Sequence, residues 1–214
     1  MIKMNKINSN ENILYSIGYS CHTIDTFRKA LLDNNVTAVA DVRSSPYSKF
    51  KPDFNKDIIT KKLIKFGIVY VFLGNNLGAR IDAPECYKNG KADYDLIAKH
   101  PTFLAGLERL KKGMENYKIA LMCAEKDPIT CHRAILIFRN LRNLNIKLAH
   151  ILCDGTVEYH TESEKRLLKL LNLEQLDLFA DNSDIFDKAY KLQAQKIAYK
   201  IDHDNTTQFS EAPI

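Results

Sequence analysis

The sequence has no long hydrophobic run. A helix that spans a membrane needs about 20 consecutive apolar residues, and no stretch of the chain approaches that length. The N-terminal segment MIKMNKINSNEN is polar and lacks the apolar core of a signal peptide. We therefore expect a cytoplasmic protein with no membrane partner.

Cysteine is scarce, and its spacing fits none of the usual patterns. The chain of 214 residues has five cysteines, an odd number, and no C-x-x-C pair. This spacing matches no disulfide framework, so a reduced cytosolic protein is the simplest interpretation. Cys86 and Cys153 have no expected role.

Charge is plentiful but unevenly distributed. The formal net charge is +5. The segment from Leu173 to Ile214 contains four lysines and eight acidic residues, a net charge of −4, which leaves +9 on residues 1–172. A basic body with an acidic tail suits a polyanionic partner such as nucleic acid, although many proteins with this charge bind none.

Short apolar runs alternate with amphipathic stretches along the chain. We expect strands at residues 13–18, 37–42, 68–73, 118–122 and 147–152, and helices after Thr23 and Pro101 and at residues 56–66, 128–143, 161–171 and 185–200. This alternation predicts right-handed crossovers and a three-layer, Rossmann-like α/β domain with a mainly parallel five-stranded sheet, followed by a C-terminal helical tail.

The chain divides into three regions. We expect a flexible N-terminus of residues 1–11, an α/β domain of residues 12–172, and a tail of residues 173–214 that carries the peptide QLDLF and one further helix. Within the domain, residues 74–94 contain Gly, Asn and Pro and predict a long loop. Loops of that length in compact domains are more often functional than idle.

The stretch LMCAEKDPITCHR, from Leu121 to Arg133, gathers reactive residue types in one strand-to-helix turn. Asp127 followed by Pro128 is a strong signal for a helix start. This places Cys131 in the first helical turn. Ligands of open α/β sheets bind at the carboxyl ends of the strands, so we expect the reaction centre here.

Other strands end at the same edge if the sheet is parallel. The candidate residues at this edge are Gly18, Ser20, Asp41, Arg43, Ser48, Gly78, Arg80, Glu125, Cys131, His132 and Arg133. Of these, four are candidate catalytic residues: Asp41, Glu125, Cys131 and His132. The others are candidates for binding a substrate, above all a phosphate.

The chemistry of these residue types suggests their roles. Asp41 or Glu125 would be the general acid or base. Cys131 would be the nucleophile, because a helix N-terminus lowers the pKa of a thiol. The guanidinium groups of Arg43, Arg80 and Arg133 would hold phosphates.

Structural interpretations of the same residues stay open. Cys131 falls in register with Ala134 and Phe138, which predicts a buried, inert thiol equally well, and Cys123 also favours the core. His132 and Arg133 point away from that apolar face and toward the expected cleft. Arg133 would otherwise pair with Glu125 or Asp127, and Asp41 with Arg43, as ion pairs that hold loops in place.

A metal site is the other interpretation of the cysteines. Cys123, Cys131 and His132, with Cys21 or His22 from the first strand, supply ligand types that zinc uses. The C-x7-C-H spacing matches no structural zinc pattern. We therefore predict no metal ion and no defined cofactor, and zinc is the less favoured alternative.

The motifs YSIGYS, DVRSSPYS, LGNNLG, LMCAEKDPITCHR and AHI, in this order, resemble the family called domain of unknown function 488. The resemblance runs from Leu14 to Asp154 and implies a Rossmann-like α/β fold without a settled activity. Its signature positions map onto Gly18, Ser20, Asp41, Arg43, Pro46, Ser48, Leu77, Gly78, Cys123, Glu125, Cys131, His132, Arg133 and His150. Tyr19 stands where the family often has histidine, and Cys21 matches no family cysteine.

The tail contains the peptide QLDLF, with Gln175, Leu176, Leu178 and Phe179 as its anchors. It resembles the short peptides by which bacterial replication and repair proteins bind the DNA sliding clamp. An extended peptide with a glutamine and an apolar end fits such a groove. The alternative is that these apolar side chains fold back onto the domain.

Three functions follow from these patterns. The leading hypothesis is an enzyme that acts on nucleic acid or a nucleotide-like phosphorylated substrate, recruited to DNA repair or replication through the sliding clamp. The second is a non-catalytic nucleic-acid-binding or adaptor protein. The third is a thiol- or metal-dependent enzyme that acts on a small molecule.

Overall fold

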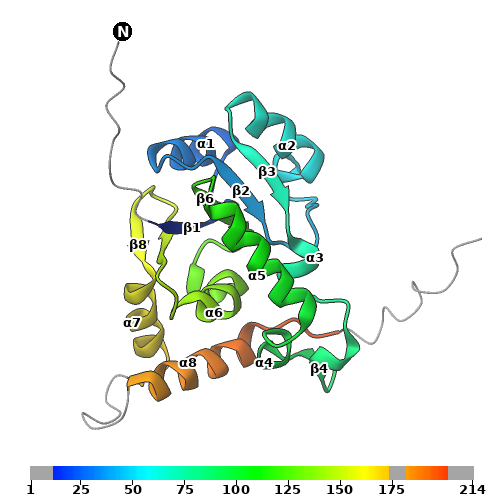
Figure 1. Cartoon of the computed structure of the whole chain (residues 1–214), viewed down its shortest axis with the longest axis vertical. Coiled ribbons are helices and arrows are strands. Elements are labelled where there is room, and N and C mark those ends of the chain that lie inside the picture. Colours follow the sequence, from blue (N-terminus) through cyan, green and yellow to red (C-terminus); the bar gives the residue numbers. More distant parts are fainter. Residues whose placement is uncertain (1–11, 174–181, 202–214) are drawn as a thin grey trace, which may run out of the picture.

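The computed structural model describes residues 12–173 and 182–201, and its centre is a six-stranded sheet between two layers of helices (Figure 1). The strand order is β3-β2-β6-β1-β7-β8. The strands are β1 (Ile13–Gly18), β2 (Ala38–Asp41), β3 (Val69–Phe72), β6 (Ile119–Cys123), β7 (Lys147–Ile151) and β8 (Val157–Tyr159). The first five of these run parallel, and β8 pairs antiparallel with β7.

The expected α/β class and parallel sheet are confirmed, but the strand count is corrected from five to six. The missed strand, β8, has only three residues, and none of them is fully buried. Such a short edge strand has no hydrophobic pattern to reveal it. The place of β6 between β1 and β2 matters most, because the candidate motif follows directly from β6.

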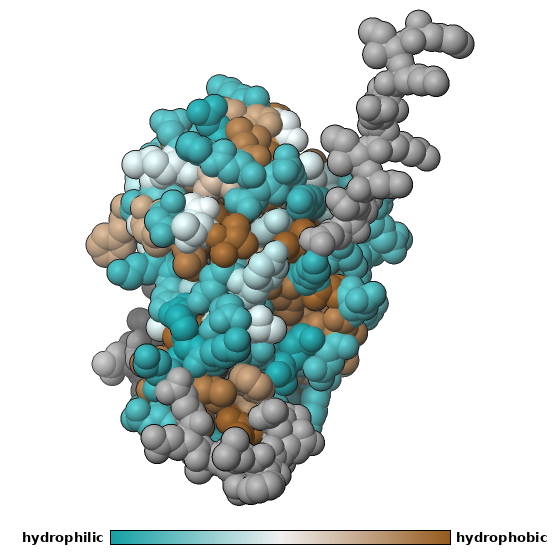
Figure 2. Space-filling view, turned by 90° about the vertical axis from the view of Figure 1, so that its left-hand side faces the viewer, coloured by the Kyte–Doolittle hydropathy of each residue, from teal (hydrophilic) through white to brown (hydrophobic). Residues whose placement is uncertain are grey.

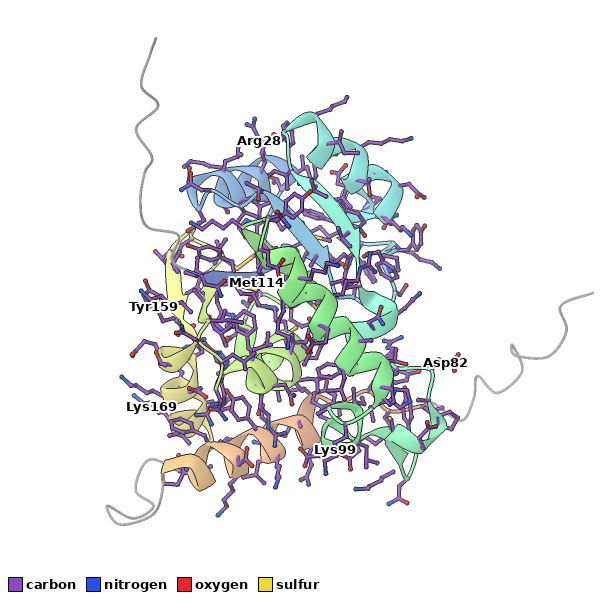
Figure 3. The ribbon with its side chains drawn as sticks, in the orientation of Figure 1. Arg28, Asp82, Lys99, Met114, Tyr159 and Lys169 are labelled. Atoms are coloured by element: carbon purple, nitrogen blue, oxygen red, sulfur yellow. A yellow bond between two sulfur atoms is a disulfide. The ribbon has the colours of Figure 1, made fainter. Side chains whose placement is uncertain are left out.

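Helices cover both faces of the sheet because the strand residues alternate between two cores. On one face, α1 (Ile24–Asp33) and α2 (Lys56–Lys65) pack on the side that includes Tyr15, Val39 and Met122. On the other face lie α5 (Pro101–Met114), α6 (Arg139–Leu141), α7 (His160–Leu170) and α8 (Asn182–Ile197). Side chains fill the space between these layers (Figure 3). The helix expected at residues 185–200 is thus observed as α8.

The long loop expected at residues 74–94 is wrong, because this region forms several short elements. They are α3 (Gly74–Leu77), a 3-10 turn (Pro84–Cys86), the hairpin of β4 (Tyr87–Lys88) and β5 (Lys91–Ala92), and α4 (Tyr94–Ile97). The Asp93 side chain caps α4 by accepting from the N–H groups of Asp95 and Leu96. Buried side chains such as Leu77 and Tyr94 anchor these elements to the core.

The helix expected at residues 128–143 starts where predicted but is interrupted. Pro128–Thr130 form a 3-10 turn, which the Asp127 side chain caps at the N–H of Ile129. Cys131 is then extended (φ −131°, ψ 144°), and a new helix follows, first as a π-helix over Arg133–Phe138. Cys131 therefore lies at the break before a helix and not in a first turn. Such π segments occur often at functional sites.

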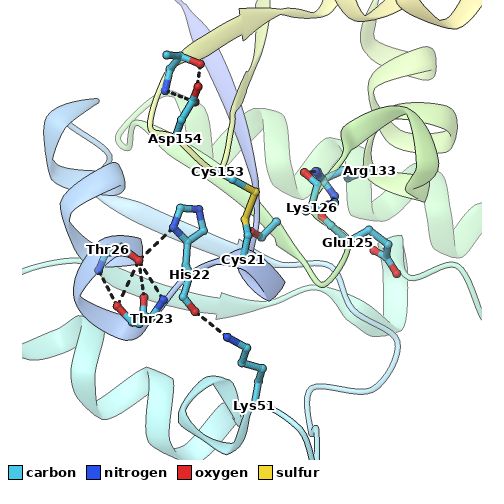
Figure 4. Close-up of a disulfide and its surroundings, with 12 residues drawn as sticks. Cys21, His22, Thr23, Thr26, Lys51, Glu125, Lys126, Arg133, Cys153 and Asp154 are labelled. Atoms are coloured by element: carbon cyan, nitrogen blue, oxygen red, sulfur yellow. Dashed lines mark hydrogen bonds between the residues drawn. A yellow bond between two sulfur atoms is a disulfide. The ribbon is translucent and has the colours of Figure 1, made fainter.

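The structure contains a disulfide between Cys21 and Cys153 (Figure 4). The expectation of fully reduced cysteines is therefore wrong for this pair. The two residues are 132 positions apart and follow β1 and β7, which are neighbours in the sheet. That adjacency brings the two cysteines together, and no local spacing could have shown it.

The surface is mixed, as expected for a globular fold. On the side shown in Figure 2, hydrophilic residues surround separate apolar patches. Among the described residues, no helix is long and apolar enough to cross a membrane.

Candidate functional site

Four residues of the predicted motif form one cluster, Cys123, Glu125, Cys131 and His132, which we call the thiol cluster. The Oε2 atom of Glu125 lies 3.0 Å from the sulfur of Cys123 and 3.0 Å from the sulfur of Cys131. The Nδ1 atom of His132 lies 3.7 Å and 3.8 Å from the same two sulfurs. Both cysteines and His132 are buried, whereas Glu125 is exposed along part of its length. The cluster therefore consists of two buried thiols and a buried imidazole, with the partly exposed Glu125 between them and solvent.

The end of β1 holds the backbone of this motif in place. The N–H of Ser20 donates to the carbonyl of Ala124 at 3.0 Å. Gly18 packs so tightly against the same turn that a Cβ atom there would lie 1.9 Å from the carbonyl oxygen of Glu125. Only glycine fits this contact, so Gly18 and Ser20 position the loop of the thiol cluster.

The surroundings of the two thiols shift their pKa values in opposite directions. Burial alone would raise the pKa of Cys131, but a hydrogen bond from Cys123 and the positive charge of Arg133 outweigh it and lower that pKa well below the usual value. The same hydrogen bond, together with burial, raises the pKa of Cys123. Cys131 is therefore the thiol that loses its proton first.

The pKa of Glu125 is also shifted by its surroundings. Burial of its carboxyl group and the charge of Cys131 raise the pKa of Glu125. A carboxyl with a raised pKa holds its proton more readily near neutral pH, which is what a group that both accepts and donates protons requires.

His132 is fixed by a hydrogen bond to the main chain. Its Nε2 atom lies 3.0 Å from the carbonyl oxygen of Val42, which directly follows β2. A carbonyl oxygen can only accept, so Nε2 carries the hydrogen in this hydrogen bond. In the neutral ring, the lone pair of Nδ1 then faces the sulfurs of Cys123 and Cys131.

Arg133 is wholly buried, so the expectation that it faces an open cleft is wrong. Its guanidinium donates to the hydroxyl of Ser16 (3.1 Å) and to the carbonyls of Glu125 (2.7 Å) and Lys126 (3.1 Å). Figure 4 shows it turned toward the backbone of this loop. The reason is that this helix is buried on all sides: every residue from Cys131 to Phe138 is buried, so none of its side chains faces solvent. His132 is buried for the same reason.

Asp41 and Arg43 form a bidentate ion pair, with N–O distances of 2.9 Å and 2.6 Å. Both residues are buried, and Arg43 also donates to the carbonyl of Phe54 at 2.9 Å. The hydroxyl of Tyr70 donates to Asp41 at 2.6 Å. These contacts match the structural interpretation of the pair, and they leave the buried Nη1 atom of Arg43 without a hydrogen-bond partner.

The remaining candidates make other contacts. Ser48 accepts from the N–H groups of Phe50 and Lys51, each at 3.3 Å. The loop of Gly78 and Arg80 packs on Ser44, whose hydroxyl accepts from the N–H of Arg80 at 2.9 Å. The exposed guanidinium of Arg80 stacks 4.1 Å from the ring of Tyr199. Gln175, Leu176, Leu178 and Phe179 lie outside the described residues.

A buried chain of hydrogen bonds behind Arg133, which we call the histidine chain, was not predicted. It comprises Ser16, His150, His160, Tyr190 and Glu164, with successive distances of 2.7, 3.0, 2.8 and 2.8 Å. Because Arg133 donates to Ser16, one set of tautomers lets each hydroxyl and each ring Nε2 donate toward Glu164, while each ring Nδ1 accepts. The signal was present in the sequence, since a serine and a histidine in fully buried strands need polar partners.

Comparison with known proteins gives one match. The sequence model of the family described as domain of unknown function DUF488 matches residues 23–138. This segment is more than half of the chain and contains all four residues of the thiol cluster. Searches of curated proteins and of solved structures returned no match.

Proposed function

This chain belongs to the family described as domain of unknown function DUF488, and we propose that it is an enzyme whose reaction centre is the thiol cluster. One observation carries the proposal. A single carboxyl oxygen of Glu125 lies at the solvent side of the cluster, 3.0 Å from two buried sulfurs. This is the edge of the sheet where α/β enzymes bind their substrates.

Glu125 is the general acid and base in this proposal. A substrate that reaches the carboxyl ends of the strands meets the exposed part of Glu125 before it meets either cysteine. The carboxylate takes a proton from the attacking group and returns it to the leaving group. Asp41 does not share this role, because Arg43 and Tyr70 already occupy its carboxylate.

The proposed substrate is nucleotide-like or a nucleic acid. Residues 1–172 have a net charge of +9, which favours an anionic partner. Arg133 is occupied by internal partners, and Arg43 is buried against Asp41 and Phe54. The exposed side chains of Arg80 and Lys126 therefore take the role of phosphate-binding cations in this proposal.

Replacement of Glu125 by glutamine tests this role. We expect turnover by the Glu125→Gln variant to fall by about 100- to 10,000-fold, because glutamine has the same shape but cannot carry the proton. The assay incubates the full-length protein with nucleosides, nucleotides and short oligonucleotides and detects mass changes by liquid chromatography and mass spectrometry.

The matched control is Glu162→Gln on the exposed face of α7, which should keep wild-type turnover. Equal turnover by Glu125→Gln and wild type would contradict the role of Glu125. Failure of the wild-type protein to convert any compound of the panel would contradict the nucleotide-like substrate class.

A second proposal concerns recruitment to DNA. The QLDLF peptide supports docking on a bacterial sliding clamp, with the protein acting in repair or replication or as a non-catalytic adaptor. We expect immobilised clamp to retain the wild-type protein. It should retain at least about tenfold less of the variant in which Leu178 and Phe179 are both replaced by alanine. Replacing Ser183 by alanine is the control. Equal retention of both variants would remove clamp docking.

A further inference from the structure

The thiol cluster has the ligand types and spacing of a metal site. The sulfurs of Cys123 and Cys131 and a nitrogen of His132 all lie within 4.8 Å of one another. Zinc binds sulfur at about 2.3 Å and imidazole nitrogen at about 2.0–2.1 Å. In a tetrahedron these bond lengths separate a sulfur from a nitrogen by about 3.5–3.6 Å. The observed separations are 3.7 and 3.8 Å.

The orientation of His132 is a second, independent observation. A histidine that binds a metal almost always donates its other ring N–H to a carbonyl or carboxylate, which fixes the ring and its tautomer. The Nε2 atom of His132 makes this contact with the carbonyl of Val42 at 3.0 Å. Its Nδ1 atom is thereby directed at the two sulfurs, at 3.7 and 3.8 Å.

We propose that Cys123, Cys131 and His132 bind a zinc ion, whose fourth position faces Glu125 and solvent. Thiolate and imidazole ligands select zinc over magnesium or calcium, which prefer oxygen. Three protein ligands and one open position are typical of catalytic zinc sites, whereas structural sites have four protein ligands. This inference rests on the proposed function, because it names the cofactor of the same reaction centre.

The charges of such a site balance. Binding converts two thiols and Zn²⁺ into a bis-thiolate complex and releases two protons to solvent. The zinc ion and two thiolates then sum to zero, and the buried Arg133 cation offsets the Glu125 carboxylate. A neutral cluster avoids the large desolvation cost of an isolated buried charge.

Glu125 would act on the ligand in the fourth position. Zinc lowers the pKa of a bound water to about 7, which makes hydroxide available near neutral pH. A carboxylate beside that water accepts its proton. The Oε2 atom of Glu125, equally close to both sulfurs, is placed for this role and is not needed to hold the metal.

Metal analysis of the full-length protein tests the proposal. We expect about one zinc per chain in wild type, in Glu125→Gln and in Cys86→Ala. We expect at least about tenfold less zinc in Cys123→Ala, Cys131→Ala and His132→Ala. Cys86 is the matched control, because it is also buried and unpaired but lies in the hydrophobic core.

A second measurement does not depend on whether the variants fold. Wild-type protein is stripped with a chelator, divided, and alkylated briefly with or without added zinc chloride. Zinc should slow the alkylation of Cys123 and Cys131 and leave the rate at Cys86 unchanged, as read by peptide mass spectrometry. Equal rates at Cys123 and Cys131 with and without zinc would overturn the site.

The two proposals fail separately. Stoichiometric zinc together with full turnover by Glu125→Gln would overturn the proposed function and leave the metal site standing. Wild-type protein without bound zinc, together with loss of turnover in Glu125→Gln, would overturn the metal site alone.

Discussion

Replacement of Arg133 by methionine is expected to destabilise the fold by about 3–5 kcal/mol. The guanidinium is wholly buried and bridges β1, through Ser16, to the carbonyls of Glu125 and Lys126. Methionine fills part of the volume but leaves these three acceptors without their donor. Hydrogen bonds from a charged donor are the stronger class, at about 1.5–3 kcal/mol each.

Urea unfolding followed by circular dichroism measures this loss. Arg109→Met is the control, since Arg109 is an exposed arginine on α5 and its replacement should change stability by less than about 0.5 kcal/mol. Arg133→Lys should also be destabilised, because an ammonium cannot reach three separated acceptors in the way that the planar guanidinium does. A loss below about 1 kcal/mol for Arg133→Met would show that Arg133 does not hold the loop.

Acidification from pH 7 to pH 5 is expected to cost the fold about 4 kcal/mol through His150 and His160. Burial is the largest cause for both: it lowers the pKa of His160 to about 3 and that of His150 well below 6.5. In the unfolded chain each histidine has its ordinary pKa of about 6.5 and gains a proton as pH falls. The folded state stays neutral at both rings, so each contributes about 2 kcal/mol of lost stability.

The sign follows from the lowered pKa values. Stability from the two rings is complete above pH 6.5 and declines as pH falls toward 3. Burial also lowers the pKa of His22, which therefore adds to the loss of stability on acidification. The pKa of His132 is raised, so this residue has the opposite effect.

Urea unfolding at several pH values checks this dependence. The His160→Gln variant can still accept from His150 and donate to Tyr190, but it cannot titrate. The slope of its unfolding free energy between pH 5 and pH 6 should be about half of the wild-type slope. A wild-type protein that is equally stable at pH 5 and pH 7 would contradict the neutral state of the histidine chain.

The layers of the fold could be predicted from the sequence because they depend on local hydrophobic periodicity. All five predicted strands exist, and their observed ends lie close to the predicted ones. The pair Asp127 and Pro128 also marked a true cap. The edge strand β8 escaped because three partly exposed residues carry no such pattern.

The sequence showed that the residues of the thiol cluster belong to one motif, but the orientation of their side chains could not be predicted. The local register placed Arg133 on the side of the helix opposite Cys131 and Ala134, which predicted a side chain that faces solvent. In the fold every residue from Cys131 to Phe138 is buried, and the extended backbone at Cys131 interrupts the helix, which the local pattern did not show. Long-range pairs such as Cys21 with Cys153 depend on strand order, which local patterns do not contain.

The disulfide between Cys21 and Cys153 turns most of the domain into a covalent ring. The ring includes the family-matched segment 23–138 and the whole thiol cluster. In the chain-entropy model, a cross-link over this span raises the free energy of the unfolded chain by about 5 kcal/mol and so stabilises the fold. A single proteolytic cut at any residue between the two cysteines would open the ring but release no fragment. The residues of the thiol cluster would then stay on one molecule until a reductant separates the two pieces.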